Sequence, residues 1–541
     1  MTSLASSPDR PTRLAFRAGD VVRVLGYAVA IGAAGALLPG VTCAAVAGAL
    51  VAFEVACFGG RRAPAPAAML VALAAALAAP LLATATTRAL VLGVGAVAWV
   101  ALAWARPLVA LAALIAIAPF HTLVLSVLEG RWLLEGGALG QWKDLGIATL
   151  GVRALAMAVR REGRSAACAD PRAWARPVRW GVALTAWVAA TSVRALVVHQ
   201  VGLGLALRGL AADLGPLALV GIAARVAGDD PAEARRLRAL TVWLAALLAV
   251  FGLVQLAILG PGWYAAAGYT GPRDFKVPGY EHYRLTSVFL DPLPAGLVFA
   301  IASLLALDDA FRAGVAGARV RSLALAAGLA VTALATFTRS AWLGLALGAA
   351  IVARVHWRDR AARRWIALAV LATAAATLPL APRLASWTRD TLTGAATDTS
   401  SPRHLEAWLR GAQTLADHPW GLGPGRAGEV SVRVLGANGI VTESSYLQFG
   451  VEYGIVGMGL LTGFVLSMGR ALLAAAVAGR AGAAGVGAAW CALALAACFL
   501  HALTERPAAY PVMILAGISL APPLGRGRLA TAAAPRAGVT S

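Results

Sequence analysis

The stretch "LAVTALATFTRSAWLGLALGAAIVA" at residues 329–353 decides the fold, because its only charged residue is Arg339. The nearest charges on either side are Arg321 and Arg354. One helix joining those two arginines would be roughly 50 Å long at about 1.5 Å per residue. That is too long for one crossing of a hydrocarbon core of ~30 Å. The stretch therefore predicts two short membrane crossings and a tight turn, with Arg339 at the outer face.

The rest of the chain has the same apolar character. Hydrophobic residues make up 60% of its 541 residues and charged residues only 13%. Apolar runs long enough to cross a bilayer recur along the chain, which predicts an all-α, polytopic transmembrane helical bundle of about 12–16 spans. The expected spans are 22–39, 41–58, 66–84, 89–105, 107–127, 144–159, 177–196, 206–226, 239–260, 285–307, 322–338, 341–355, 364–381, 446–469, 484–503 and 509–522.

Basic loops give the expected orientation. A net charge of +21 is interpreted as arginines that hold loops in the cytoplasm, and no nucleic acid is expected as a partner. The bilayer itself is a partner, and both termini are expected on the cytoplasmic side. The predicted parts are a cytoplasmic tail (1–20), N-terminal transmembrane helices (21–204), a transmembrane core (205–470) with an extracytoplasmic loop (382–445), C-terminal transmembrane helices (471–522) and a second tail (523–541).

The long loop 382–445 contains "SPRHLEAWLRGAQTLADHPWGLGPG". Ser401 is a suitable N-cap and Pro402 suits the first helical position. Apolar residues then recur on one helical face, which predicts an amphipathic helix lying on the outer membrane face. This helix should end before the His418-Pro419 pair.

Four arginines lie on the outer side, where basic residues are expected to be rare. They are Arg284, Arg339, Arg403 and Arg410. Arginine stays charged and its fork of donors fits phosphate oxygens. Arg339 and Ser340 also open the helix after the turn, where free N–H groups attract anions. A pyrophosphate site is the functional interpretation; topological anchoring or pairing with a carboxylate is the alternative.

A second constellation follows at residues 441–461. Glu443 closes the outer loop and is followed by Ser444 and Tyr446. Glu452 lies further into the span, where a carboxylate is costly unless it is paired or faces a polar cavity. A partly buried carboxylate at a membrane face can act as a general base, so Glu443 is the predicted catalytic residue. The alternative is a helix-terminal acid that favours the helix dipole.

Other features exclude some functions or support the site weakly. Tyr283 closes a tyrosine-rich loop at 261–284, which fits a sugar-binding cleft or an interfacial aromatic belt. None of the five cysteines forms a CxxC pair and the outer histidines lack metal-ligand spacing, so no metal and no cofactor are expected. Metalloprotease HExxH, Walker A and GxSxG patterns are missing from the sequence.

Four blocks together resemble the O-antigen ligase and polymerase superfamily of bacterial envelope enzymes. They are "YRLTSVFLDPLPAG" (283–296), "ATFTRSAWLGLALG" (335–348), "RHLEAWLRGAQTLADHPWGLGPG" (403–425) and "ESSYLQFGVEYGIVGMGLL" (443–461). The resemblance covers about residues 205–465 and implies a multi-pass enzyme of the inner membrane. Such enzymes transfer a glycan from a polyprenyl-pyrophosphate-linked oligosaccharide to the hydroxyl of an acceptor glycan, without a metal. Other polysaccharide-assembly proteins are possible partners.

The resemblance also assigns roles to residues. The family's arginines bind the donor pyrophosphate, which matches Arg284 and Arg339, and Arg403 fits the family's loop block. Ligases typically carry a histidine where this chain has Glu443, which favours a polymerase of surface polysaccharide over a lipid A-core ligase. A transporter or flippase of a lipid-linked or anionic substrate is the alternative from another class, with a non-catalytic assembly scaffold as a further one.

Overall fold

A computed structural model describes residues 85–132, 140–159, 171–198, 201–228, 231–260, 262–263, 283–358 and 400–521, together with a few residues between 363 and 385. The chain forms two compact units, residues 1–90 and residues 91–541. The packing described below lies within the second unit. The predicted spans at 22–39, 41–58 and 66–84 and both predicted tails lie outside the described residues, as does nearly all of 364–381.

The described chain is built of helices. They are α4 (Ala85–Ala105), α5 (Pro107–Ile117), α6 (His121–Trp132), α8 (Trp142–Val159), α9 (Pro171–Val198), α10 (Leu203–Ala227), α11 (Pro231–Val254), α13 (Pro292–Arg312), α14 (Ala316–Ala335), α15 (Arg339–His356), α18 (Ser400–Asp417), α19 (Gly428–Leu435), α20 (Ser445–Val477), α21 (Ala483–Ala496) and α22 (Arg506–Leu520). A π-helical turn, η3 (Gln255–Leu259), extends α11. Within the described residues no β-strand occurs, so the predicted all-α fold is confirmed.

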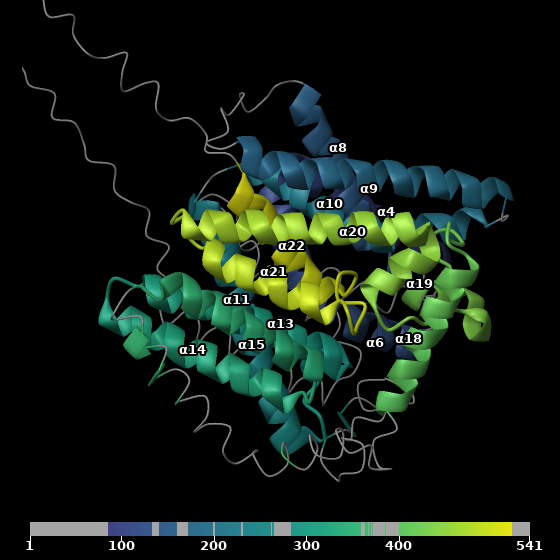
Figure 1. Ribbon diagram of the computed structural model, residues 1–541. Coiled ribbons are helices and arrows are strands. Elements are labelled where there is room, and N and C mark those ends of the chain that lie inside the picture. The colour runs from purple at the N-terminus through teal and green to yellow at the C-terminus, as the bar shows by residue number, and fades with distance from the viewer. Residues whose placement is uncertain are drawn as a thin grey trace, which may run out of the picture. The chain divides into compact units, whose positions relative to one another are not determined.

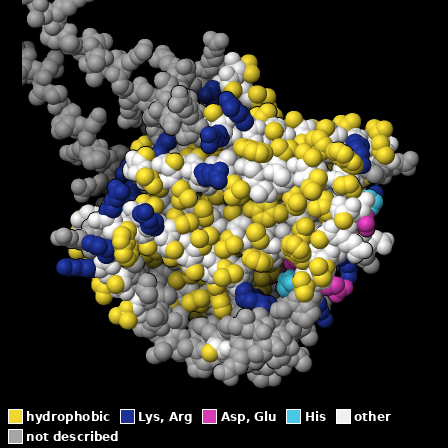
Figure 2. Space-filling model, in the orientation of Figure 1, with side chains coloured by type: hydrophobic (Ala, Val, Ile, Leu, Met, Phe, Trp, Pro, Cys, Tyr) yellow, Lys and Arg dark blue, Asp and Glu magenta, His cyan; other side chains and the backbone are white. Residues whose placement is uncertain are grey.

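Seven stretches of the described residues are long and apolar enough to cross a membrane. They are Pro107–Ser126, Ala175–Val198, Leu203–Ala227, Pro231–Leu259, Pro292–Arg312, Ala316–Ala335 and Ser445–Val477. Large apolar side chains such as Val182, Val197 and Val477 are more than 60% exposed. Figure 2 shows hydrophobic side chains over much of the visible face and many of its charged side chains toward its edges. Exposed apolar helices of this length fit a membrane-embedded protein.

The turn expected at Arg339 is present. Helix α14 ends at Ala335 and α15 begins at Arg339, so that three residues connect the two helices. Neither helix exceeds 20 residues, which corresponds to at most about 30 Å at ~1.5 Å per residue. The predicted turn between two short helices is therefore present, and Arg339 stands at a helix terminus. Of the two predicted crossings, α14 is among the candidate spans and α15 is not.

Helix α13 is the most buried of the candidate spans. It packs against α14, α15 and α21, and α20 packs against α9 and α21 (Figure 1). Helices α15 and α21 run antiparallel, since Gly344 lies against Ala492 and Val352 shares an apolar cluster with Ala488. The start of α15 and the end of α21 therefore lie at the same end of the bundle.

Helix α20 is kinked where the loop that follows α18 joins it. Gly454 has φ 76° and ψ 179°, a backbone conformation open to glycine. A side chain there would lie 2.4 Å from the carbonyl oxygen of Pro419. The kink leaves backbone groups for the loop, because the amide of Leu422 donates to Val451 at 2.8 Å and that of Gly423 to Glu452 at 2.9 Å. The loop after α18 is thus fixed to a membrane helix by its backbone.

An ion-pair network joins four segments at the opposite end of α13. Arg238 of α11 is 4% exposed and donates to Asp308 of α13 at 2.8 Å and to the carbonyl of Gly482 at 2.9 Å. His356, in the last turn of α15, lies 2.9 Å from the other oxygen of Asp308. The charge of Arg238 is thus buried and paired.

Replacing Arg238 by leucine should destabilise the protein by about 3–5 kcal/mol, because it leaves the carboxylate of Asp308 buried without its partner. The measurement is the free energy of unfolding in detergent micelles. The control is Arg236→Leu, which removes an exposed pair with Glu233 and should cost no more than about 1 kcal/mol. Equal losses in the two variants would contradict a structural role for the network.

Candidate functional site

Arg284 binds the turn between α14 and α15. Its Nε donates to the carbonyl of Thr336 at 3.0 Å, and its Nη2 donates to the carbonyl of Phe337 at 3.1 Å. The same nitrogen lies 3.3 Å from the hydroxyl of Thr338. The guanidinium therefore satisfies carbonyls that no helix can satisfy at this turn, and it lies beside the residues that precede Arg339.

Arg339 and Ser340 form the first turn of α15. Thr338 is the N-cap residue, but its hydroxyl donates to the carbonyl of Pro292 at 2.9 Å instead of accepting from the helix. Phe337 has φ 51°, which is uncommon and costly for a bulky side chain. Arg339 is partly exposed, whereas Ser340 is buried. The turn thus presents a cation and a helix N-terminus without a side-chain cap at one end of the bundle.

The start of α20 is anchored on the end of α21. Ser444 caps α20 by accepting from Leu447, and its hydroxyl lies 3.2 Å from the carbonyl of Ala497. The amide of Ser445 donates to Ala497 at 2.9 Å, and the hydroxyl of Tyr446 donates to Ala494 at 3.1 Å. Because α15 also packs on α21, the two predicted groups around Arg339 and Glu443 lie at the same end of the bundle. Tyr283 is partly exposed and directly precedes Arg284.

Glu443 lies beside a histidine of helix α18. Its Oε2 lies 3.3 Å from Nδ1 of His404, with side chains 27% and 38% exposed. Glu443 has φ 50°, a left-handed conformation that costs a non-glycine residue about 1–3 kcal/mol. Strain of this kind persists only where the surroundings impose it, and it is frequent at functional sites. The carboxylate is thus partly exposed, paired and fixed in direction.

A second histidine lies behind this pair. Nε2 of His501, in the segment between α21 and α22, is 3.1 Å from the hydroxyl of Thr442. Burial raises the pKa of Glu443, but the hydrogen bond and charge of His404 and the charge of His501 lower it. The net pKa is below that of an ordinary glutamate. Glu443 is therefore ionised and able to accept a proton at neutral pH.

The loop-helix arginines lie on an exposed surface of α18. The helix begins at Ser400, one residue before the expected cap, and ends at Asp417, as expected before His418. Arg403 is exposed. Arg410 forms an exposed pair with Glu406 at 2.7 Å, one turn apart on the helix. Arg403 is thus the loop-helix arginine adjacent to the His404–Glu443 pair.

Glu452 lies inside α20 and is 1% exposed. Its Oε1 accepts from the amide of Ala427 at 2.9 Å, so it holds the loop that follows α18. Its carboxyl faces Asp213 of α10, which accepts from Gln448 at 2.8 Å and from Tyr453 at 2.7 Å. Glu452 faces a partner rather than a polar cavity, and its contacts are those of a residue that positions the loop.

This arrangement combines a partly exposed carboxylate, an adjacent histidine and an arginine-bearing turn at one end of an apolar bundle. Residues 324–462 match the family model described as O-antigen ligase. The match supports the expected resemblance to the O-antigen ligase and polymerase superfamily over this part of the chain. The match includes the turn of Arg339, the whole of α18, the loop to Glu443 and the kink of α20. No curated protein matches the chain.

Part of the site lies outside the matched O-antigen ligase region. Three residues of the site come from segments before or after residues 324–462. Arg284 binds the turn before Arg339, Asp213 faces Glu452, and His501 lies against Thr442. The sequence interpretation missed His404, His501 and Asp213 as members of the site. His404 directly follows Arg403 in a quoted block, which is a signal that could have found it. Among the described residues, no cluster of histidine, cysteine or acidic side chains could hold a metal ion.

Replacing Arg284 by alanine should loosen the turn between α14 and α15, because the carbonyls of Thr336 and Phe337 lose their donor. Hydrogen exchange of amides in residues 330–345 should speed up about fivefold or more, which corresponds to about 1 kcal/mol. Arg284→Lys should restore protection only in part, since an ammonium lacks the planar fork. Arg321→Ala, at the exposed start of α14, is the control. Exchange at the wild-type rate in Arg284→Ala would refute the clamp.

Proposed function

We propose that this protein transfers a glycan from a polyprenyl pyrophosphate donor to a sugar hydroxyl of an acceptor glycan at the outer face of the inner membrane. The observation that carries the proposal is Glu443, an ionised carboxylate held by His404 at the same end of the bundle as Arg339. The O-antigen ligase match supports glycan transfer of this type.

In the proposed step the acceptor hydroxyl oxygen attacks the anomeric carbon of the donor sugar. A new carbon–oxygen bond forms while the bond from that carbon to the pyrophosphate oxygen breaks, which inverts the anomeric centre. The acceptor proton passes to the carboxylate of Glu443, and polyprenyl pyrophosphate leaves. Glu443 is the general base of this step, and its partial exposure gives an acceptor access to it.

The arginine turn supplies the electrostatic part. Arg339 binds the pyrophosphate together with the N–H groups at the start of α15, where the helix dipole also favours an anion. Negative charge grows on the leaving oxygen during the reaction, so a fixed cation stabilises the transition state more than the ground state. Arg284 donates to the carbonyls of the turn, so in the proposal it positions Arg339, and its own charge adds to the field.

A polymerase of surface polysaccharide is favoured over a ligase to lipid A-core. The reason is Glu443, which stands where ligases of this family typically carry a histidine. A chain-length gel of surface polysaccharide from a deletion strain separates the two. Single repeat units left on the acceptor indicate a polymerase, whereas unattached full-length chains indicate a ligase.

The site predicts different kinetic effects for Arg339→Ala and Glu443→Gln. With purified protein and polyprenyl-pyrophosphate glycan, Arg339→Ala should lower kcat/KM by about 10²–10³-fold, because it removes a fixed charge at the leaving group. Glu443→Gln should lower kcat by about 10²–10⁴-fold and leave donor binding unchanged, because only the proton acceptor is lost. Chain elongation on a gel and donor binding are the measurements.

The control for both variants is Arg321→Ala, at the opposite end of α14, which should retain wild-type turnover. Wild-type rates in Arg339→Ala would refute the pyrophosphate site, and wild-type rates in Glu443→Gln would remove that residue from the mechanism. Translocation of the donor across reconstituted vesicles without glycan extension would support transport instead.

The pH dependence of transfer should respond to His404. Since His404 lowers the pKa of Glu443 and the base acts in its ionised form, activity should fall as pH drops through that pKa. His404→Leu removes the bond and the charge, so the acid limb of the pH–rate profile should move to higher pH. His404→Asn keeps a donor in place and should move it less. An unmoved acid limb in His404→Leu would show that His404 does not act on the base.

A further inference from the structure

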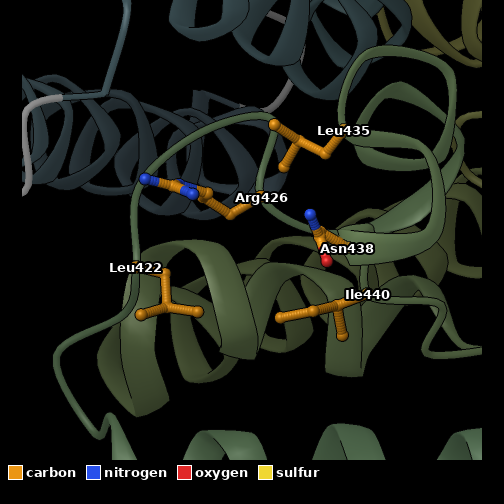
Figure 3. Close-up of a pocket in the computed structure, with 5 residues that line it drawn as sticks. All are labelled: Leu422, Arg426, Leu435, Asn438 and Ile440. Atoms are coloured by element: carbon orange, nitrogen blue, oxygen red, sulfur yellow. The ribbon is translucent and has the colours of Figure 1, made fainter.

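A pocket opens in the loop that follows α18, on the surface between the glycine-rich segment and the residues after α19. It is lined by Leu422, Arg426, Leu435, Asn438 and Ile440 and has a volume of about 200 Å³. Figure 3 shows the five side chains around a common space, with Leu435 on one side and Leu422 and Ile440 across from it. Three walls are aliphatic, and the polar groups are one guanidinium and one amide.

The backbone on both sides of Arg426 is fixed. Gly425 has φ 77°, and a side chain there would lie 2.7 Å from the carbonyl of Leu205 in α10. Ala427 is fully buried and donates its amide to Glu452, while the amide of Gly428 donates to the carbonyl of Ile440 at 2.9 Å. The position of Arg426 is thus set by contacts with two membrane helices and with the opposite wall of the pocket.

The side chain of Arg426 has no such constraint. Among the described residues, no hydrogen bond or ion pair involves it, although arginines on neighbouring segments have acidic or carbonyl partners. Arg410 pairs with Glu406, Arg433 lies 3.6 Å from Glu429, and Arg194 donates to Trp420. A cation held on a rigid backbone beside three aliphatic walls, with an amide next to it, has the chemistry of a binding site for an anion with an apolar face.

We propose that this pocket binds one acidic sugar residue of the glycan substrate, with its carboxylate on Arg426. A carboxylate matches the two parallel donors of a guanidinium. The C–H face of a sugar ring fits the side chains of Leu422, Leu435 and Ile440, and the amide of Asn438 can pair with a ring hydroxyl. This inference rests on the proposed function, because it assigns a subsite to the glycan of that reaction.

Size and charge decide between candidate ligands. A volume of about 200 Å³ is below the ~300–1,000 Å³ of pockets for drug-sized ligands, so it suits one sugar ring and not an oligosaccharide. A pyrophosphate carries more charge than the single arginine of this pocket balances. One wall of the pocket also belongs to the segment of the proposed base, since Ile440 lies three residues before Glu443 in the chain. A sugar bound here would be a neighbour of the one that reacts at Glu443.

The test is binding of small probes to the full-length protein in detergent micelles, by saturation-transfer NMR. Sodium glucuronate should bind, and neutral glucose should bind about tenfold more weakly or worse, because it lacks the charge-assisted bond. Arg426→Gln should weaken glucuronate binding about tenfold or more and leave glucose unchanged. Arg426→Lys, which keeps the charge but not the fork, should lie between. The matched control is Arg433→Gln in the neighbouring exposed pair, which should bind glucuronate as the wild type does.

Thermal melting of each variant checks that the fold is retained. Equal binding of glucuronate and glucose, or wild-type binding in Arg426→Gln, would overturn the proposal. Tighter binding of glucose 6-phosphate than of glucuronate would overturn the carboxylate assignment. These measurements involve no transfer step. Selective glucuronate binding by a protein that elongates no glycan would therefore refute the proposed function alone, and active transfer without selectivity would refute the subsite alone.

Discussion

Backbone polar groups in an apolar bundle need partners, and this requirement shapes the candidate site. The turn between α14 and α15 leaves carbonyls that the helices do not satisfy, and Arg284 donates to them. The loop that follows α18 meets the same requirement through Glu452, which accepts from Ala427, and through the kink of α20 at Gly454. Both candidate segments are therefore positioned by polar contacts to membrane helices, which gives loop residues the fixed geometry that transition-state stabilisation requires.

Backbone strain is concentrated in the same segments. Four non-glycine residues of the described chain have positive φ: Ser287, Leu290, Phe337 and Glu443. Ser287 and Leu290 follow Arg284 in the chain, and Phe337 lies in the turn that Arg284 binds. The fourth residue, Glu443, is the proposed base. Each such conformation costs about 1–3 kcal/mol, so the packing around them must over-determine it. Contacts such as Ser287 Oγ to the carbonyl of Leu248 at 2.7 Å provide this support. Backbone strain of this kind is consistent with segments whose function depends on the direction in which their side chains point.

The sequence predicts the local elements well and the contacts between them poorly. The turn before Arg339 follows from helix length and membrane thickness, and the end of α18 follows from His418-Pro419. The contact of His404 with Glu443 joins residues 39 positions apart, and that of His501 with Thr442 joins residues 59 positions apart. The periodicity of apolar residues along a helix does not predict contacts between residues so far apart in the sequence. Arg284 was expected at a pyrophosphate, and its bonds to the turn depend on a tertiary packing that composition does not encode.

The two glutamates of the 443–461 block show why burial separates their roles. Glu452 is almost fully buried, accepts from a loop amide and faces Asp213, so an incoming hydroxyl has no route to it without breaking the contacts that hold the loop. Glu443 is partly exposed, and His404 offsets the effect of burial on its pKa. A general base must be both ionised and reachable by its substrate. Of these two carboxyl groups Glu443 satisfies both conditions, and Glu452 serves it by fixing the loop on which it lies.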